Sequence, residues 1–304
     1  MWGAIGKLQH RFMFEKPNKN LFQREDAIVK VNVLLKNRIE TANEIRNYGS
    51  NLIFEAYDNS DYELLDSVLI LNFVFDAINL LDSILVLAEE GCHLTVPYFV
   101  RGIIENSFYI EWLLKNNSTQ RAEYFYTYIL FEELSLTSFV NDNPEQFVKN
   151  IDAEEFGILK NLKSVSGHTE KRVKQIKSHF DKHFPEHYKR LKQNFPAKWY
   201  SVNNKISSLK DIANKIDRTK DYEIFYKGYS KSIHSSNPNG NLKITKHGGA
   251  TTPIRSIGDL QNHLMNSVSY IFRIYRHIIQ KYIPEEEENF NRIYIERWRK
   301  NYIK

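Results

Sequence analysis

The chain contains little cysteine, glycine or proline. Cys92 is the single cysteine among 304 residues, which excludes an internal disulfide and a multi-cysteine zinc site. A reducing, cytoplasmic location is therefore expected. The 12 glycines and 8 prolines are few for this length. Because many-stranded folds need frequent turns, their scarcity, together with long periodic apolar stretches, favours an all-α protein.

The chain also lacks a strong net charge, a signal-peptide core and an uninterrupted transmembrane run. Its formal net charge of +5 is compatible with nucleic acid but is shared by many ordinary proteins. The apolar stretch 68–88 contains two asparagines and two aspartates. Since charges inside a bilayer are expensive, we expect this stretch to be a core helix, and we expect no membrane partner.

Familiar catalytic and metal-binding motifs are absent as well. The glycine patterns of Walker, Rossmann and kinase folds do not occur, nor does a Gly-x-Ser-x-Gly elbow. His179, His183 and His187 follow one another at steps of four, but Pro185 breaks that helix. We therefore expect neither a metal site nor a cofactor.

Long helical periods dominate what is present. The hydrophobic fraction of 42%, with 13% aromatic residues, can fill a substantial core. We predict an irregular N-terminal arm at 1–20, one bundle of long antiparallel helices at 21–284, and a C-terminal helical tail at 285–304. Within the bundle, the lysine-rich segment 141–195 is expected to form an exposed insertion of short helices. A first helix is predicted to end at Gly49, and a second at Gly91. Further helices are predicted at about 95–117, 118–140, 207–216, 221–235 and 257–282.

Two short polar patterns lie in otherwise apolar helical segments. One is Arg101-x-x-x-Glu105, and the other is Tyr229-Ser230-x-x-x-His234. A spacing of four places the polar groups of each pattern one turn apart on one helix face. Two interpretations stay open at this point. The residues are either ordinary ion pairs and satisfied core groups, or two halves of one polar site.

In this order the patterns resemble an uncharacterised bacterial helical family, a domain of unknown function, over about residues 65–240. The family is similar in character to the HEPN-like helical proteins found near mobile elements and defence loci. Carried over, its pattern falls on six residues: Arg101, Glu105, Trp199, Tyr229, Ser230 and His234. Trp199 and Tyr226 are expected to contact a ligand. Unlike the HEPN signature Arg-x(4–6)-His, Arg101 and His234 lie on different helices, so they must meet in space.

The resemblance implies a metal-independent ribonuclease, or an RNA- or nucleotide-binding effector in bacterial antiphage defence. In that hypothesis His234 is the general acid and base, and Arg101, oriented by Glu105, stabilises charge on a phosphate. Tyr229 or Ser230 holds a substrate oxygen. The alternative is a non-catalytic interaction protein whose polar network fixes the bundle, with a homodimer formed through the long terminal helices. A nucleotide sensor without turnover is a third, weaker option.

Overall fold

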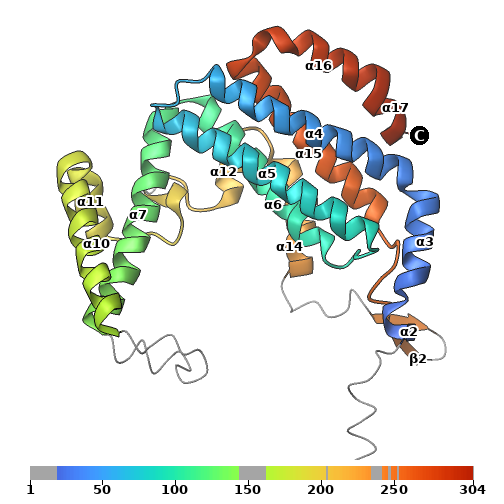
Figure 1. The fold of residues 1–304 in the computed structure, drawn as a ribbon, viewed down its shortest axis with the longest axis horizontal. Helices are drawn as coiled ribbons and strands as arrows, with labels where there is room; N and C mark the ends of the chain where they lie inside the picture. Colours follow the sequence, from blue (N-terminus) through green and yellow to red (C-terminus); the bar gives the residue numbers. More distant parts are fainter. Residues whose placement is uncertain are drawn as a thin grey trace, which may run out of the picture. The chain divides into compact units, whose positions relative to one another are not determined.

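The computed structural model describes residues 19–143, 162–202, 205–233, 242–245, 248–251 and 253–303, so most of the predicted arm lies outside it. The predicted all-α fold class is confirmed. Besides helices, the described residues form one antiparallel hairpin of β1 (Leu242–Thr245) and β2 (Gly248–Thr251). The chain divides into two compact units, one of Met1–Lys115 with Ile212–Lys304, the other of Asn116–Asp211 (Figure 1).

Four long helices build the core of the first unit: α4 (Lys36–Asp58), α5 (Leu65–Glu89), α6 (Val96–Lys115) and α15 (Leu260–Tyr282). Helices α5 and α15 each contact the other three, and both α4 and α6 pack on α5 and on α15. Fully buried aliphatic side chains such as Val74, Ile103 and Ile274 fill the space between them. Two shorter helices, α2 (Lys19–Phe22) and α3 (Arg24–Leu34), precede α4.

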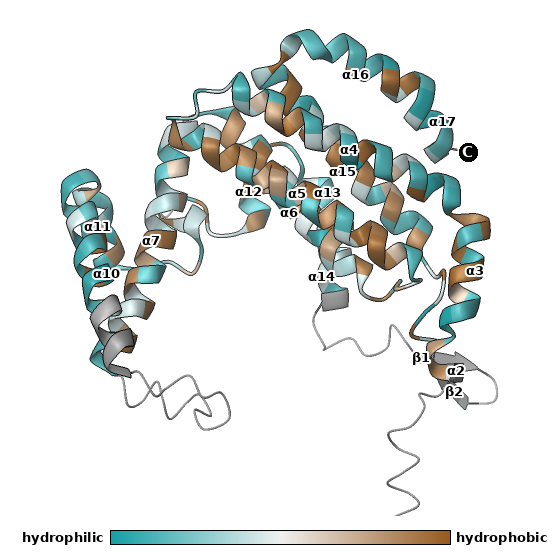
Figure 2. Cartoon of the chain, in the orientation of Figure 1, coloured by the Kyte–Doolittle hydropathy of each residue, from teal (hydrophilic) through white to brown (hydrophobic). Residues whose placement is uncertain are grey.

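Among the described residues, α5 alone is long and apolar enough to cross a membrane by length and composition. It packs against α4, α6 and α15. Its residues Val74, Ala77 and Leu81 are fully buried in these contacts, and the helix is largely hydrophobic along its length (Figure 2). The burial is partial, because Phe75 and Val86 on the same helix are 64% and 56% exposed.

Two glycines show how the helix ends were predicted well in one place and wrongly in another. Gly91 follows α5 with φ of 68°, the left-handed conformation of a helix C-terminus, as predicted. Gly49, the other predicted helix end, lies inside α4. A Cβ atom on Gly49 would lie 1.8 Å from the hydroxyl oxygen of buried Tyr275. Close packing against α15, and not helix termination, therefore explains the glycine at position 49.

A chain of short elements leads to the second polar pattern. It runs through α12 (Leu209–Lys215), α13 (Thr219–Asp221), the π-helix η3 (Tyr222–Tyr226) and α14 (Lys227–Ile233). One regular helix was predicted over 221–235. The π-helical turn instead places an additional residue in the turn before α14, and such turns often occur near functional sites.

The C-terminal tail packs along α4 (Figure 1). It consists of η5 (Pro284–Glu286), α16 (Glu287–Ile293), η6 (Tyr294–Trp298) and α17 (Arg299–Ile303). Tyr48 of α4 packs its ring on Phe290 and on Trp298, and the Tyr302 hydroxyl donates to the Arg38 carbonyl at 3.1 Å. The tail is thus anchored by aromatic packing.

The second unit is built from α7 (Ser118–Asp142), α10 (Leu162–His183), α11 (Pro185–Gln193) and the short 3-10 helix η2 (Trp199–Ser201). Helix α10 packs on α7 through buried Ile176 and Phe180. Helices α10 and α11 are largely hydrophilic outside this contact (Figure 2). The lysine-rich segment predicted at 141–195 belongs to this unit, and its residues 144–161 lie outside the described ones.

Candidate functional site

The first polar pattern is held on α6, where it contacts the segment η3–α14. Arg101 donates from Nη2 to the Tyr226 hydroxyl at 2.7 Å, and its guanidinium lies over the Tyr226 ring at 5.0 Å. Nη2 is also 3.8 Å from a Glu105 carboxylate oxygen. Glu105 in turn accepts a hydrogen bond from Tyr109 at 2.7 Å. We call these four residues the Arg101 network.

The Arg101 network is partly exposed at its two charged residues and buried at its two tyrosines. The side chains of Arg101 and Glu105 are 28% and 29% exposed. The Arg101 Nε atom is buried and has no hydrogen-bond partner among the described residues. Burial and the Glu105 carboxylate raise the pKa of Tyr226, so its hydroxyl stays protonated near neutral pH. The network therefore presents a cation steadied by one carboxylate and one neutral hydroxyl.

Asn72, Asp76 and Asn79 form a polar stripe on α5, the helix that packs against α6. Asp76 of that stripe accepts a hydrogen bond from Asn106 of α6 at 2.7 Å. Ser230 makes a hydrogen bond within its own segment, because its hydroxyl donates to the Tyr226 carbonyl at 2.8 Å. A serine that bonds the carbonyl four residues before it uses its proton within its own helix.

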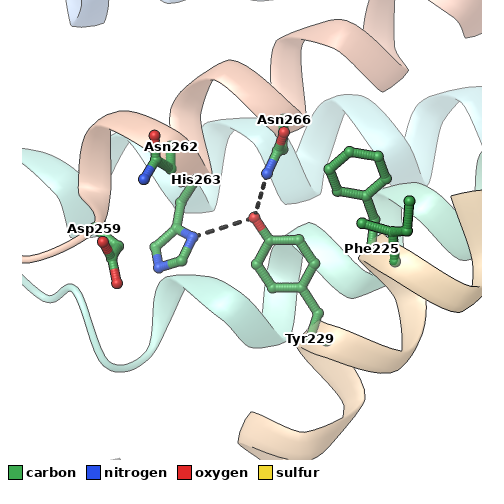
Figure 3. Close-up of a pocket in the computed structure, with 8 residues that line it drawn as sticks. Phe225, Tyr229, Asp259, Asn262, His263 and Asn266 are labelled. Atoms are coloured by element: carbon green, nitrogen blue, oxygen red, sulfur yellow. Dashed lines mark hydrogen bonds between the residues drawn. The ribbon is translucent and has the colours of Figure 1, made fainter.

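Tyr229 faces α15 and lines a pocket of about 330 Å³. Its hydroxyl accepts a hydrogen bond from the Asn266 amide at 2.8 Å and lies 3.2 Å from Nδ1 of His263 (Figure 3). The other lining residues come from the same two segments: Ile224, Phe225, Gly228, Asp259 and Asn262. We call this cavity the Tyr229 pocket.

His263 is neutral in this environment. Burial lowers its pKa to about 4, although the nearby Asp259 carboxylate opposes the shift. The Tyr229 oxygen accepts from Asn266, and we assign its proton to the bond with His263 Nδ1. We therefore assign the proton of the imidazole to Nε2. The pocket then offers amide groups, an imidazole N–H and one carboxylate, with no Lys or Arg among its lining residues.

A second polar cluster on α6, which the sequence patterns did not single out, surrounds Glu111. This carboxylate is 7% exposed and accepts a hydrogen bond from Arg218 at 3.0 Å. Arg273 and His277 of α15 lie 3.8 and 3.7 Å away from it. Arg273 also pairs with Asp221 at 2.5 Å. We call these five residues the Glu111 cluster.

The charges of the Glu111 cluster keep its carboxylate ionised. Burial acts to raise the pKa of Glu111, but His277 and Arg218 outweigh it and hold the pKa below its ordinary value. Arg218 directly precedes α13 and Asp221 is its last residue, immediately before the π-helical turn. The cluster thereby ties the start of the η3–α14 segment to both α6 and α15.

A regular pattern on α15 could have revealed the α15 residues of the Tyr229 pocket and of the Glu111 cluster, which the two sequence patterns do not include. Polar residues and one tyrosine recur there at spacings of three or four, with one adjacent pair, which places them along one side of the helix. They are Asp259, Asn262, His263, Asn266, Tyr270, Arg273 and His277. Tyr270 joins the two ends of this stripe, because its ring contacts Phe225 of the Tyr229 pocket and lies 5.0 Å from the Arg273 guanidinium.

The remaining predicted residues fall elsewhere. Trp199 is buried in the second unit, where its ring packs edge-on against Phe125. His234 lies outside the described residues.

In the second unit, α10 ends at His183 and α11 begins at Pro185, so the predicted break in the histidine series is confirmed. Within the described ranges, no three His, Cys, Asp or Glu side chains are grouped closely enough to hold a metal ion.

These features define an all-α protein with a polar pocket between two helical segments. The chain belongs to DUF5677, a family of unknown function, whose model matches residues 67–249. This confirms the predicted membership of a family of unknown function. No curated protein and no solved structure matches the chain. The matched range includes Arg101, Tyr226 and Tyr229, whereas the α15 side of the Tyr229 pocket lies beyond it.

Proposed function

We propose that this protein binds RNA or a nucleotide through the Tyr229 pocket and the adjoining Arg101 network. The observation that carries the proposal is the convergence of hydrogen-bonding groups from two elements on one cavity, with a Phe225 wall beside them. Unpaired bases are recognised by this combination of edge hydrogen bonds and aromatic contact. Arg101, on the other side of the same η3–α14 segment, supplies a guanidinium, whose geometry suits phosphate oxygens.

The catalytic form of the proposal is metal-independent RNA cleavage. His234 acts in it as general acid and base, and Arg101 stabilises charge that develops on the phosphate. The Glu105 carboxylate, 3.8 Å from Arg101, orients the guanidinium. HEPN-like character, a cytoplasmic location and a role in bacterial antiphage defence belong to the same proposal, and the sequence resemblance is their support.

Binding and cleavage are tested on the full-length protein with total RNA and with a fluorescent oligoribonucleotide. Tyr229→Phe removes one hydroxyl and should weaken oligonucleotide binding about tenfold. Tyr98→Phe, at an exposed tyrosine of α6, is the matched control and should bind normally. His234→Ala and Arg101→Ala should abolish cleavage. Equal cleavage by all variants, or none by the wild type, contradicts the ribonuclease; absence of RNA and nucleotide binding contradicts the proposal as a whole.

One observation favours the non-catalytic alternative. Arg101 and Glu105 both find partners inside the protein, in Tyr226 and Tyr109, as a network that fixes helix packing would require. In that case Tyr226→Phe should lower the melting temperature by several degrees and leave RNA binding unchanged. A variant that loses binding at an unchanged melting temperature supports the ligand site instead.

A further inference from the structure

The charge of the Tyr229 pocket indicates which part of a nucleotide it accommodates. Among its lining residues Asp259 is the single charged side chain, because His263 is neutral. Phosphate groups would meet a carboxylate there and no cation to compensate for it. The pocket is therefore suited to an uncharged ring, and a phosphate attached to that ring must lie outside it.

The Asp259 carboxylate is available to such a ring. Asp259 occupies the position before the first turn of α15, where aspartate commonly caps the helix by accepting backbone N–H groups. Here its side chain makes no capping hydrogen bond. It is exposed and lines the pocket together with Asn262 and His263 (Figure 3).

The donors and acceptors of the pocket distinguish among the bases. A carboxylate has two acceptor oxygens and no donor. Of the common bases, guanine alone presents two adjacent donors, N1–H and the 2-amino group, on its pairing edge, with the O6 acceptor next to them. The Asn262 amide and the His263 Nε2–H are donors suited to O6, and Phe225 with exposed Ile224 provides the apolar wall for the ring.

We infer that the Tyr229 pocket is a guanine-binding site in which Asp259 accepts from N1–H and the 2-amino group of the base. The inference rests on the proposed function and names its ligand: a guanine base, carried either by a free nucleotide or by an unpaired position in RNA. Asp259 is then the residue that determines base specificity. A site built on such hydrogen bonds rejects bases that leave its polar groups unpaired.

Calorimetric titration of the full-length protein with GMP, IMP and AMP tests the inference. GMP should bind about tenfold or more tightly than AMP, since a well-placed bidentate contact discriminates by about that factor. IMP lacks the 2-amino group and should fall between them. Asp259→Asn should remove the preference for GMP. Asp58→Asn, at an exposed carboxylate on α4, should retain it.

Two fluorescent oligoribonucleotides of equal length, one containing unpaired guanosine and one without guanosine, separate the two ligand sources. A guanosine preference with the oligonucleotides but not with mononucleotides identifies RNA as the carrier. Asn262→Ala is a second variant, expected to weaken GMP binding without removing the GMP preference over AMP.

The possible failures are distinguishable. If the oligonucleotides bind equally and GMP binds no better than AMP, the guanine inference is wrong while the proposed function stands. If Asp259→Asn folds normally and keeps the full GMP preference, Asp259 is not the specificity residue and the inference is again overturned. If no nucleotide and no oligonucleotide binds, both the guanine inference and the proposed function are wrong.

Discussion

Helix α6 carries two polar groups that differ in how completely the protein satisfies them. The Glu111 cluster surrounds one buried carboxylate with two arginines and a histidine. The Arg101 network surrounds one half-exposed guanidinium with a distant carboxylate and a phenol, and leaves Nε without a partner among the described residues. The first arrangement links three segments of the fold, whereas in the second the guanidinium donates a hydrogen bond to the Tyr226 hydroxyl.

This difference shows why polar residues on an apolar helix should not be treated alike. A buried carboxylate is tolerated only where several donors compensate for its lost hydration, so Arg218, Arg273 and His277 are engaged with it although their side chains are 33%, 27% and 31% exposed. A cation at the edge of the core keeps contact with solvent and can exchange water for an anion. The two groups on α6 should therefore respond differently to the same substitutions.

The largest expected effect is the loss of stability in Glu111→Ala. Removing the carboxylate leaves Arg218 and Arg273 close together without their shared partner, which should lower the free energy of unfolding by about 3 kcal/mol. Hydrogen exchange of the α6 amides in the native state measures the loss. The matched variant Glu105→Ala, at a more exposed carboxylate, should cost about 1 kcal/mol or less. Similar losses in both variants would show that the two groups are energetically alike.

A smaller effect is expected from pH, and it separates the Tyr229 pocket from the Glu111 cluster. The pKa of His263 is about 4 in the folded chain and 6.5 without the fold. Between these values the unfolded chain binds the proton more readily, so stability should fall as the pH is lowered from 6.5 to 4. The change should amount to about 2–3 kcal/mol.

Glu111 changes the stability of the protein over a lower pH range than His263 does. Its pKa is depressed below 4.5, so its contribution is present above that value and is lost as the pH falls through the folded pKa. His263→Gln should therefore flatten the stability profile between pH 6.5 and 4, and Glu111→Gln should change the profile only below pH 4.5. Urea unfolding at successive pH values measures both. An unaltered profile in His263→Gln would show that this histidine does not titrate as proposed.

The smallest expected effect on stability is that of Arg101→Lys. The lysine keeps the charge but not the planar fork, and the site is partly exposed, so the loss should be about 1 kcal/mol or less. Oligoribonucleotide binding, measured by fluorescence anisotropy, should nevertheless weaken several-fold. Arg218→Lys is the control in the Glu111 cluster, where we expect the reverse: a larger loss of stability and little change in binding. If both variants lose binding equally, the distinction between the two groups disappears.

The long helices were predictable because their signals are local. The apolar period and Gly91 located the end of α5, and the predicted helices at α6, α7 and α15 lie within a few residues of the observed ones. The glycine in α4 was misinterpreted because its cause, the Tyr275 hydroxyl, comes from a distant part of the sequence. Packing of that kind cannot be recognised from the neighbouring residues.

The site was predictable in part for the same reason. The spacing of Arg101 and Glu105 predicts their proximity, and the structure places them 3.8 Å apart at their closest charged atoms. Their connection to Tyr226 depends on tertiary packing, as does the contact of Tyr229 with His263. The polar stripe of α15 was present in the sequence, but its apolar face suggested only a packing or dimer helix. Reading both faces of that helix would have found His263.

The π-helical turn at Tyr222–Tyr226 makes the site depend on the number of backbone residues as well as on the side chains. Each residue of an α-helix turns the chain by about 100°, so deleting one residue there to restore a regular α-helix would rotate α14 by about that angle. Tyr226 would leave Arg101, and Tyr229 would leave His263, although no contacting side chain had been altered. Related sequences that differ in length at this turn should therefore not be expected to share the site, however well their individual residues align.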